Sequence, residues 1–187
     1  VVTIDALIEA LWGDAPPGQA ENTVQSYVSR LRRVLPGNGA SLVVTRRPGY
    51  VAAVDREHVD AERFRALAAA GRRDLGAGRP EAAAAELRDA LRLWRGEAYA
   101  EFDAPFAVAE RTALEEVRLA AVEDRIAADV ALGAGPELVG ELETLVGRHP
   151  WRERLWRHLM TALYRSGRQA DALDAYQRAR TSLIEDL

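Results

Sequence analysis

The sequence contains no cysteine, no lysine and only one methionine among its 187 residues. Without cysteine there is no disulfide framework and no thiolate metal site, which fits a cytoplasmic location. No run of about 18 apolar residues occurs, so we expect no membrane span. Because arginine supplies all the non-histidine positive charge, while alanine, glycine and valine are abundant, the composition is typical of a GC-rich genome.

Residues for catalysis or metal binding are equally scarce. The histidines, His58, His149 and His158, have no carboxylate or second histidine at ligand spacing, and His158 is expected on a helix surface or in a groove. No phosphate-binding glycine-rich motif is present. Acidic residues lie near arginines at helical spacing, as Glu115 does with Arg118, which is typical of surface pairs. We therefore expect no enzyme activity, no cofactor and no metal.

Positive charge is concentrated in one segment. The net charge is −4, yet residues 22–54 hold five arginines and no acidic residue. The four acidic residues of the first 54 positions all precede Asn22. A local positive field on an otherwise acidic chain indicates an element that contacts nucleic acid.

That segment reads as an amphipathic helix followed by a hairpin. Apolar residues recur at helical spacing from Val24 to Leu35, and Pro36-Gly37 ends the helix. Strands are predicted near 42–45 and 50–54, with Arg46-Arg47-Pro48-Gly49 at the tip. Side chains able to bond base edges and phosphates occupy the outer face of the helix, at Asn22, Ser26, Ser29 and Arg33, and its flanks, at Gln25, Arg30 and Arg32.

The simpler interpretation of the three helix arginines is a solvated face, as most charge runs are. The basic hairpin that follows and the lack of acidic residues favour DNA contact instead. Arg30 is the first candidate, because it flanks the groove face and can reach a guanine edge or a phosphate. For Arg46 and Arg47 the simpler interpretation is that their charge keeps the hairpin tip soluble. The functional interpretation is that Arg47 contacts the minor groove of DNA.

Outside this segment the sequence predicts helices. One is expected at 4–12, with Thr3 as its N-cap and Gly13 at its end. Others are predicted at 60–76, 80–94, 104–133, 136–148, 151–166 and 169–186. Similar helix–glycine–helix junctions surround Gly78, Gly135 and Gly167, the last two 32 residues apart. This spacing is close to the roughly 34-residue tetratricopeptide repeat, whose stacked helix pairs bind partners.

Several motifs resemble known families. The segments LIEALWGDAPP, ENTVQSYVSRLRRVL and VVTRRPGYV resemble the OmpR-like winged-helix DNA-binding domain. The continuation, with HPWRERLWRHLMTALYRSGRQADAL, is similar to the bacterial transcriptional activation domain. Together they resemble the Streptomyces antibiotic regulatory proteins (SARPs).

The resemblance implies an activator of a secondary-metabolite gene cluster that binds direct-repeat double-stranded DNA and contacts RNA polymerase. It also implies that two copies sit side by side on the repeats as a homodimer. Thr23, Gln25, Ser26 and Arg30 match the family's groove contacts, and Thr45 and Arg47 match its hairpin contacts. The family's amino-terminal sheet and first helix have no counterpart here.

We therefore predict a mainly α-helical protein in two domains. Residues 1–54 are expected to form a partial winged helix-turn-helix with a β-hairpin wing, and residues 55–187 a tetratricopeptide-like activation domain. The alternative is a protein-interaction adaptor without sequence-specific DNA binding. An enzyme is the weakest interpretation. A larger form of the predicted activator, with an ATPase or sensor region after residue 187, is a further alternative.

Overall fold

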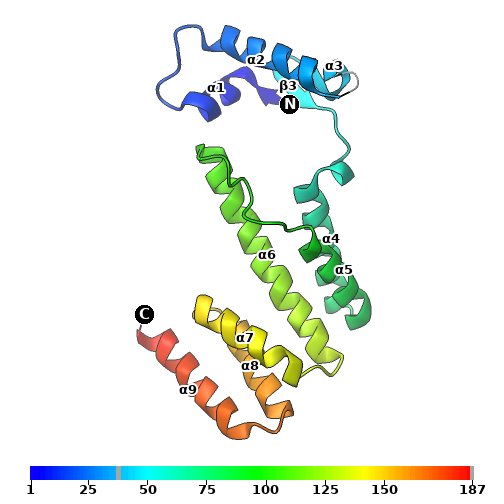
Figure 1. Ribbon diagram of the computed structural model, residues 1–187, viewed down its shortest axis with the longest axis vertical. Coiled ribbons are helices and arrows are strands. Elements are labelled where there is room, and N and C mark those ends of the chain that lie inside the picture. Colours follow the sequence, from blue (N-terminus) through cyan, green and yellow to red (C-terminus); the bar gives the residue numbers. More distant parts are fainter. Residues whose placement is uncertain (37–38, 186–187) are drawn as a thin grey trace. The chain divides into compact units, whose positions relative to one another are not determined.

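The computed structural model describes residues 1–36 and 39–185. Its backbone divides into two compact units, which are described separately below. The first comprises Val1–Arg63 and Gly96–Leu114, and the second Phe64–Arg95 and Glu115–Leu187. The elements are coloured along the chain in Figure 1.

The first unit begins with a winged helix. Its elements are β1 (Val2–Thr3), α1 (Ile4–Trp12), α2 (Ala20–Val34), α3 (Gly39–Leu42), β2 (Val43–Arg46) and β3 (Gly49–Ala52). The strands form an antiparallel sheet in the order β1-β3-β2. Both predicted hairpin strands are confirmed within two residues. The sequence did not predict β1 and α3, because elements of two and four residues show no periodicity.

The capping signals of α1 act as predicted. Thr3 Oγ1 accepts a hydrogen bond from the backbone N–H of Ala6 at 3.1 Å. At the other end Gly13 has φ +55°, and its N–H donates to the carbonyl of Glu9 at 2.8 Å. Such a left-handed residue is favourable for glycine, so the helix ends there.

The apolar stripe of α2 is only partly covered. Val24 and Val28 are buried, whereas Tyr27, Leu31 and Val34 are exposed. The ring of Tyr27 stacks on that of Trp12, with the ring centroids 6.4 Å apart. An apolar stripe of this kind predicts burial along its whole length, and that prediction is wrong for Tyr27, Leu31 and Val34. Two helices and a small sheet have too little surface to cover every apolar side chain.

The remaining elements are helical, apart from loops: the 3-10 turn η1 (Arg56–His58), α4 (Asp60–Gly76), α5 (Pro80–Arg92), α6 (Pro105–Ala131), α7 (Pro136–Arg148), α8 (Glu153–Arg165) and α9 (Gln169–Glu185). In the second unit α7, α8 and α9 lie side by side in Figure 1. Leu142, Leu155, Leu159 and Leu163 are completely buried in the core that these helices share with Ile126 of α6.

Glycines set the junctions of this unit. Gly78, Gly133 and Gly167 all have positive φ, and each lies just after a helix. The helix-ending glycine of the middle junction is thus Gly133, whereas Gly135 is the N-cap of α7. Gly133 and Gly167 are 34 residues apart, which matches the tetratricopeptide period more closely than the predicted pair.

A layer of buried charge runs along α6. The prediction that acidic residues form surface pairs is wrong for Glu123, Asp124 and Asp129, which are 2%, 3% and 7% exposed. Arg154 of α8 pairs with both Glu123 and Asp124, at 3.2 and 2.6 Å. Arg72 of α4 also donates to Asp124, at 2.8 Å. Because buried carboxylates are costly unless paired, this layer requires α4, α6 and α8 to keep their relative positions.

Candidate nucleic-acid interface

The outer face of α2 presents polar side chains to solvent. Val24 and Val28 are buried on the inner face, so residues about half a turn away point outward. The exposed predicted residues are Asn22, Gln25, Ser26, Ser29, Arg30 and Arg33. Within the described part of the chain, neither Arg30 nor Arg33 makes a side-chain hydrogen bond or an ion pair. Both guanidinium groups keep all five N–H donors for a ligand.

Two predicted residues near the start of α2 also bond within the helix. Thr23 is half-buried, and its hydroxyl donates to the carbonyl of Gln19 at 3.0 Å. Gln25 Nε2 donates to Glu21 Oε1 over a longer distance, 3.4 Å. Within residues 1–36 and 39–185 the carbonyl oxygen of the Gln25 amide and its second N–H make no further hydrogen bond, so this side chain can still bond a base edge.

Arg32 turns away from the outer face and joins α2 to the hairpin. Its Nε donates to the carbonyl of Val43 and its Nη2 to Thr45 Oγ1, both at 2.8 Å. The guanidinium also lies over the ring of Tyr50, 5.9 Å from the centroid. Arg32 and Thr45, each predicted as a DNA contact, are thus bonded to one another. In this geometry they fix the wing against the helix.

The tip of the wing carries two further arginines. Both are exposed: Arg46 forms the last cross-strand pair, with Gly49, and Arg47 lies in the turn that follows. The Arg47–Pro48 peptide bond is cis. A Cβ atom at Gly49 would lie 1.8 Å from the carbonyl oxygen of Val2, so only glycine permits β1 to pair with β3 at this point.

Sequence reasoning placed the exposed arginines correctly on solvent-facing positions but could not separate Arg32 from them. Its partners lie 11 and 13 residues further along the chain. Only the folded hairpin brings them to the helix. A bond of this kind leaves no periodic signal in the sequence.

Neither a metal centre nor a membrane-spanning helix is formed by the residues that the structure describes. Over residues 1–36 and 39–185, no group of three or more histidine, cysteine or acidic residues is arranged to hold a metal ion. Across the same residues no helix has the length and apolar character needed to cross a membrane.

Comparison with known families agrees with this arrangement. Residues 1–52 match the family "Transcriptional regulatory protein, C terminal", and residues 59–187 match the "Bacterial transcriptional activator domain". A basic helix and wing followed by stacked helix pairs therefore define a transcriptional regulator with a winged-helix DNA-binding domain.

Individual relatives show to which family of transcriptional regulators the chain belongs. The chain is 42% identical to regulatory protein AfsR of Streptomyces griseus over 185 residues, covering 99% of this chain and 19% of AfsR. It is 37% identical to regulatory protein DnrI of Streptomyces peucetius over 196 residues, covering all of this chain and 72% of DnrI. The chain belongs to the family of Streptomyces antibiotic regulatory proteins.

A solved structure shows the same fold. Mycobacterium tuberculosis EmbR, determined in complex with a low affinity phosphopeptide, superposes with a TM-score of 0.93 at 40% identity over the whole of this chain and 50% of that one. The mainly helical fold class, with a winged helix and a helical activator domain, is thereby confirmed. The chain spans about half the length of EmbR and a fifth of AfsR.

Proposed function

We propose that this regulator is an activator that reads direct-repeat promoter DNA through the outer face of α2. The observation that carries the proposal is the pair of unengaged guanidinium groups, Arg30 and Arg33, on a surface free of acidic residues from position 22 to 54. Asn22, Ser26 and Gln25 beside them can bond base edges. Arg46 and Arg47 on the wing supply phosphate or minor-groove contacts.

Arg32 and Thr45 have a different part in this proposal. Because they bond to each other, they set the angle between the recognition helix and the wing, so that both elements meet the duplex together. The exposed side chains of α2 contact the bases. Thr23, near the start of α2, orients the first turn of the helix.

The test is fluorescence anisotropy with a labelled direct-repeat promoter fragment, titrated across salt concentrations. We expect tight, sequence-dependent binding that weakens steeply with salt, because arginines displace counterions from phosphates. Arg30→Ala should cost about 1–3 kcal/mol on the preferred sequence and relax the preference. Arg180→Ala, an exposed arginine of α9, is the matched control and should bind like wild type.

Weak binding to all sequences by both wild type and Arg30→Ala would sink the proposal. The helical repeats would then carry the function as a protein-interaction adaptor.

We further propose that two copies bind adjacent repeats as a homodimer on DNA, in the cytoplasm, and that the bound protein contacts RNA polymerase to activate a secondary-metabolite gene cluster. The family membership of AfsR and DnrI supports this part. Analytical ultracentrifugation with one-repeat and two-repeat DNA tests the stoichiometry. One protein per duplex on both DNAs contradicts the paired arrangement.

A further inference from the structure

A surface pocket opens where α6 meets the turn between α7 and α8. Its volume is about 450 Å³, which lies within the range of small-molecule sites in proteins. Leu119 and Val122 of α6 and Leu145 of α7, all half-buried, supply its apolar side chains. The rest of the lining is charged or aromatic. Every lining residue belongs to the second unit, so the pocket lies within one compact body.

The turn that forms one wall of this pocket is fixed by its own hydrogen bonds. The backbone N–H of His149 donates to the carbonyl of Leu145 at 2.9 Å, and the N–H of Arg152 donates to the carbonyl of His149 at 3.1 Å. From the core, the buried Trp156 donates its indole N–H to the carbonyl of Pro150 at 2.8 Å. A wall held in this way exists before a ligand arrives, so little conformational entropy is lost on binding.

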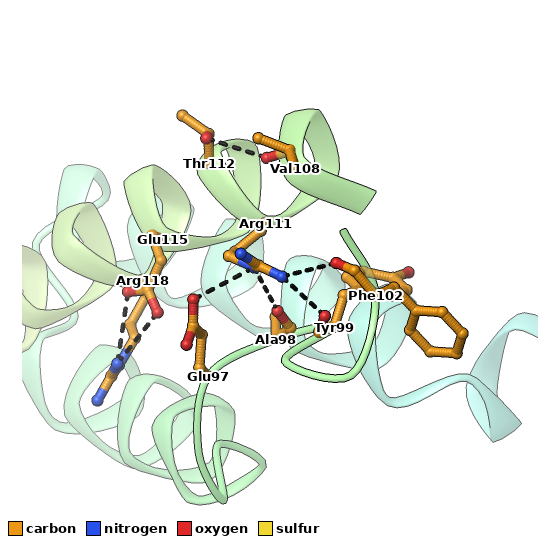
Figure 2. Close-up of polar contacts among 9 residues, drawn as sticks. All are labelled: Glu97, Ala98, Tyr99, Phe102, Val108, Arg111, Thr112, Glu115 and Arg118. Carbon is orange, nitrogen blue, oxygen red and sulfur yellow. Dashed lines mark hydrogen bonds and ion pairs between the residues drawn. The ribbon is translucent and has the colours of Figure 1, made fainter. Parts of the chain in front are cut away.

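The charged residues of the lining divide into paired and unpaired groups. Arg118 donates to both carboxylate oxygens of Glu115 at 3.4 Å, as Figure 2 shows. Arg152 pairs with Glu116. Within residues 1–36 and 39–185, the exposed Arg148 makes no side-chain hydrogen bond or ion pair. Since both glutamates of the lining already have a cation, the unpaired guanidinium favours an anionic ligand.

An aromatic side chain lines the same pocket. Trp151 is 65% exposed. Single exposed apolar residues are ordinary, but an indole beside an apolar floor offers a stacking surface for a flat ring. His149, in the same turn, is half-buried, and its side chain makes no hydrogen bond within the described part of the chain. Its ring nitrogens are therefore able to bond the polar end of a ligand.

We propose that this pocket binds a small aromatic carboxylic acid. The ring system lies between the apolar side chains and the indole of Trp151, and the carboxylate accepts a bidentate hydrogen bond from Arg148. A hollow of this size encloses most of the surface of a small molecule, whereas a protein partner contacts a much broader patch. The site belongs to the second unit and uses no residue of α2 or the wing, so this inference is independent of the proposed DNA reading.

The probe for this site is α-naphthoate, titrated into the intact regulator by isothermal titration calorimetry. We expect saturable binding. The uncharged α-naphthamide and inorganic phosphate should each bind at least about tenfold more weakly, because the first lacks the charge and the second lacks the ring. Trp151→Ala and Arg148→Ala, both at exposed positions, should each weaken α-naphthoate binding by at least about tenfold. Arg157→Ala and Tyr164→Ala alter exposed residues of α8 outside the lining, and these control variants should bind like wild type.

NMR of the indole N–H groups locates the bound probe. The four tryptophans are Trp12, Trp94, Trp151 and Trp156, and a phenylalanine substitution assigns the resonance of each. Addition of α-naphthoate should shift the Trp151 resonance, whereas that of Trp12, which belongs to the first unit, should stay in place.

Several results overturn the inference. One is the absence of saturable α-naphthoate binding by the wild type, and another is binding that survives both Trp151→Ala and Arg148→Ala. Equal affinity for the acid and the amide would leave Arg148 without a role. Equal affinity for α-naphthoate and phosphate would reduce the pocket to a plain anion site. Shifts confined to Trp12 would place the probe elsewhere on the protein.

Discussion

Burial of His158 predicts a specific dependence of stability on pH. The side chain belongs to α8 and is 7% exposed, so of its two expected positions, a helix surface or a groove, the surface is wrong. Its Nε2 atom is buried without a hydrogen-bond partner in the described chain. Burial, and then the nearby positive charges of Arg157 and Arg154, lower the pKa of His158 from 6.5 to about 4, while the Asp124 carboxylate opposes this shift.

The sign follows from proton uptake. In the unfolded chain His158 binds a proton as pH falls through about 6.5, whereas the folded protein resists it down to about pH 4. The unfolded state therefore binds more protons in this window, and its free energy falls relative to the native state. A shift of this size corresponds to at most about 3 kcal/mol of stability, present above pH 6.5 and lost progressively towards pH 4.

Urea unfolding followed by circular dichroism at several pH values between 7 and 4 measures this loss. Buried carboxylates contribute to the same curve, so the informative quantity is the difference between wild type and His158→Phe. We expect a shallower decline of the free energy of unfolding for the variant. His58→Ala is the matched control, because the His58 side chain is 75% exposed, and its curve should follow wild type. Parallel curves for wild type and His158→Phe would refute the reasoning.

Two further substitutions test contacts that the sequence did not reveal. Arg32→Ala should weaken promoter binding although the residue does not face outward, and should increase proteolysis of the wing, since its two bonds to the hairpin are lost; unchanged proteolysis would contradict the positioning role. Arg154→Leu leaves two buried carboxylates of α6 short of their partner and should lower the free energy of unfolding by about 3–5 kcal/mol in urea titrations. A cost as small as that of Arg178→Leu, which breaks more exposed pairs, would show that solvent already reaches the α6 layer.

Local signals in the sequence identified the long elements of the fold. Helix boundaries followed from apolar periodicity and from end signals such as Thr3 and Gly13, because both depend on neighbouring residues alone. The hairpin was equally clear from its Pro-Gly tip.

Properties that depend on distant residues were not predicted. Burial of Glu123 and Asp124 follows from arginines on other helices, and i,i+3 or i,i+4 spacing alone cannot distinguish such a layer from surface pairs. Arg32 is the same residue type as Arg30 and Arg33 and lies in the same stretch of helix. Only the position of the hairpin distinguishes the internal arginine from the exposed ones. The exposure of Tyr27 likewise depends on how many layers cover α2.

The bond between Arg32 and the hairpin divides α2 into two kinds of position. Side chains on the outer face, such as Arg30 and Ser26, have no structural duty within the described chain, so they can be exchanged without altering the shape of the winged helix. Arg32 has no such freedom, because its guanidinium is part of the scaffold. Under the proposed function, new operator preferences are therefore accessible by exchanging side chains on one helical face, provided that this internal arginine and its Thr45 partner are retained together.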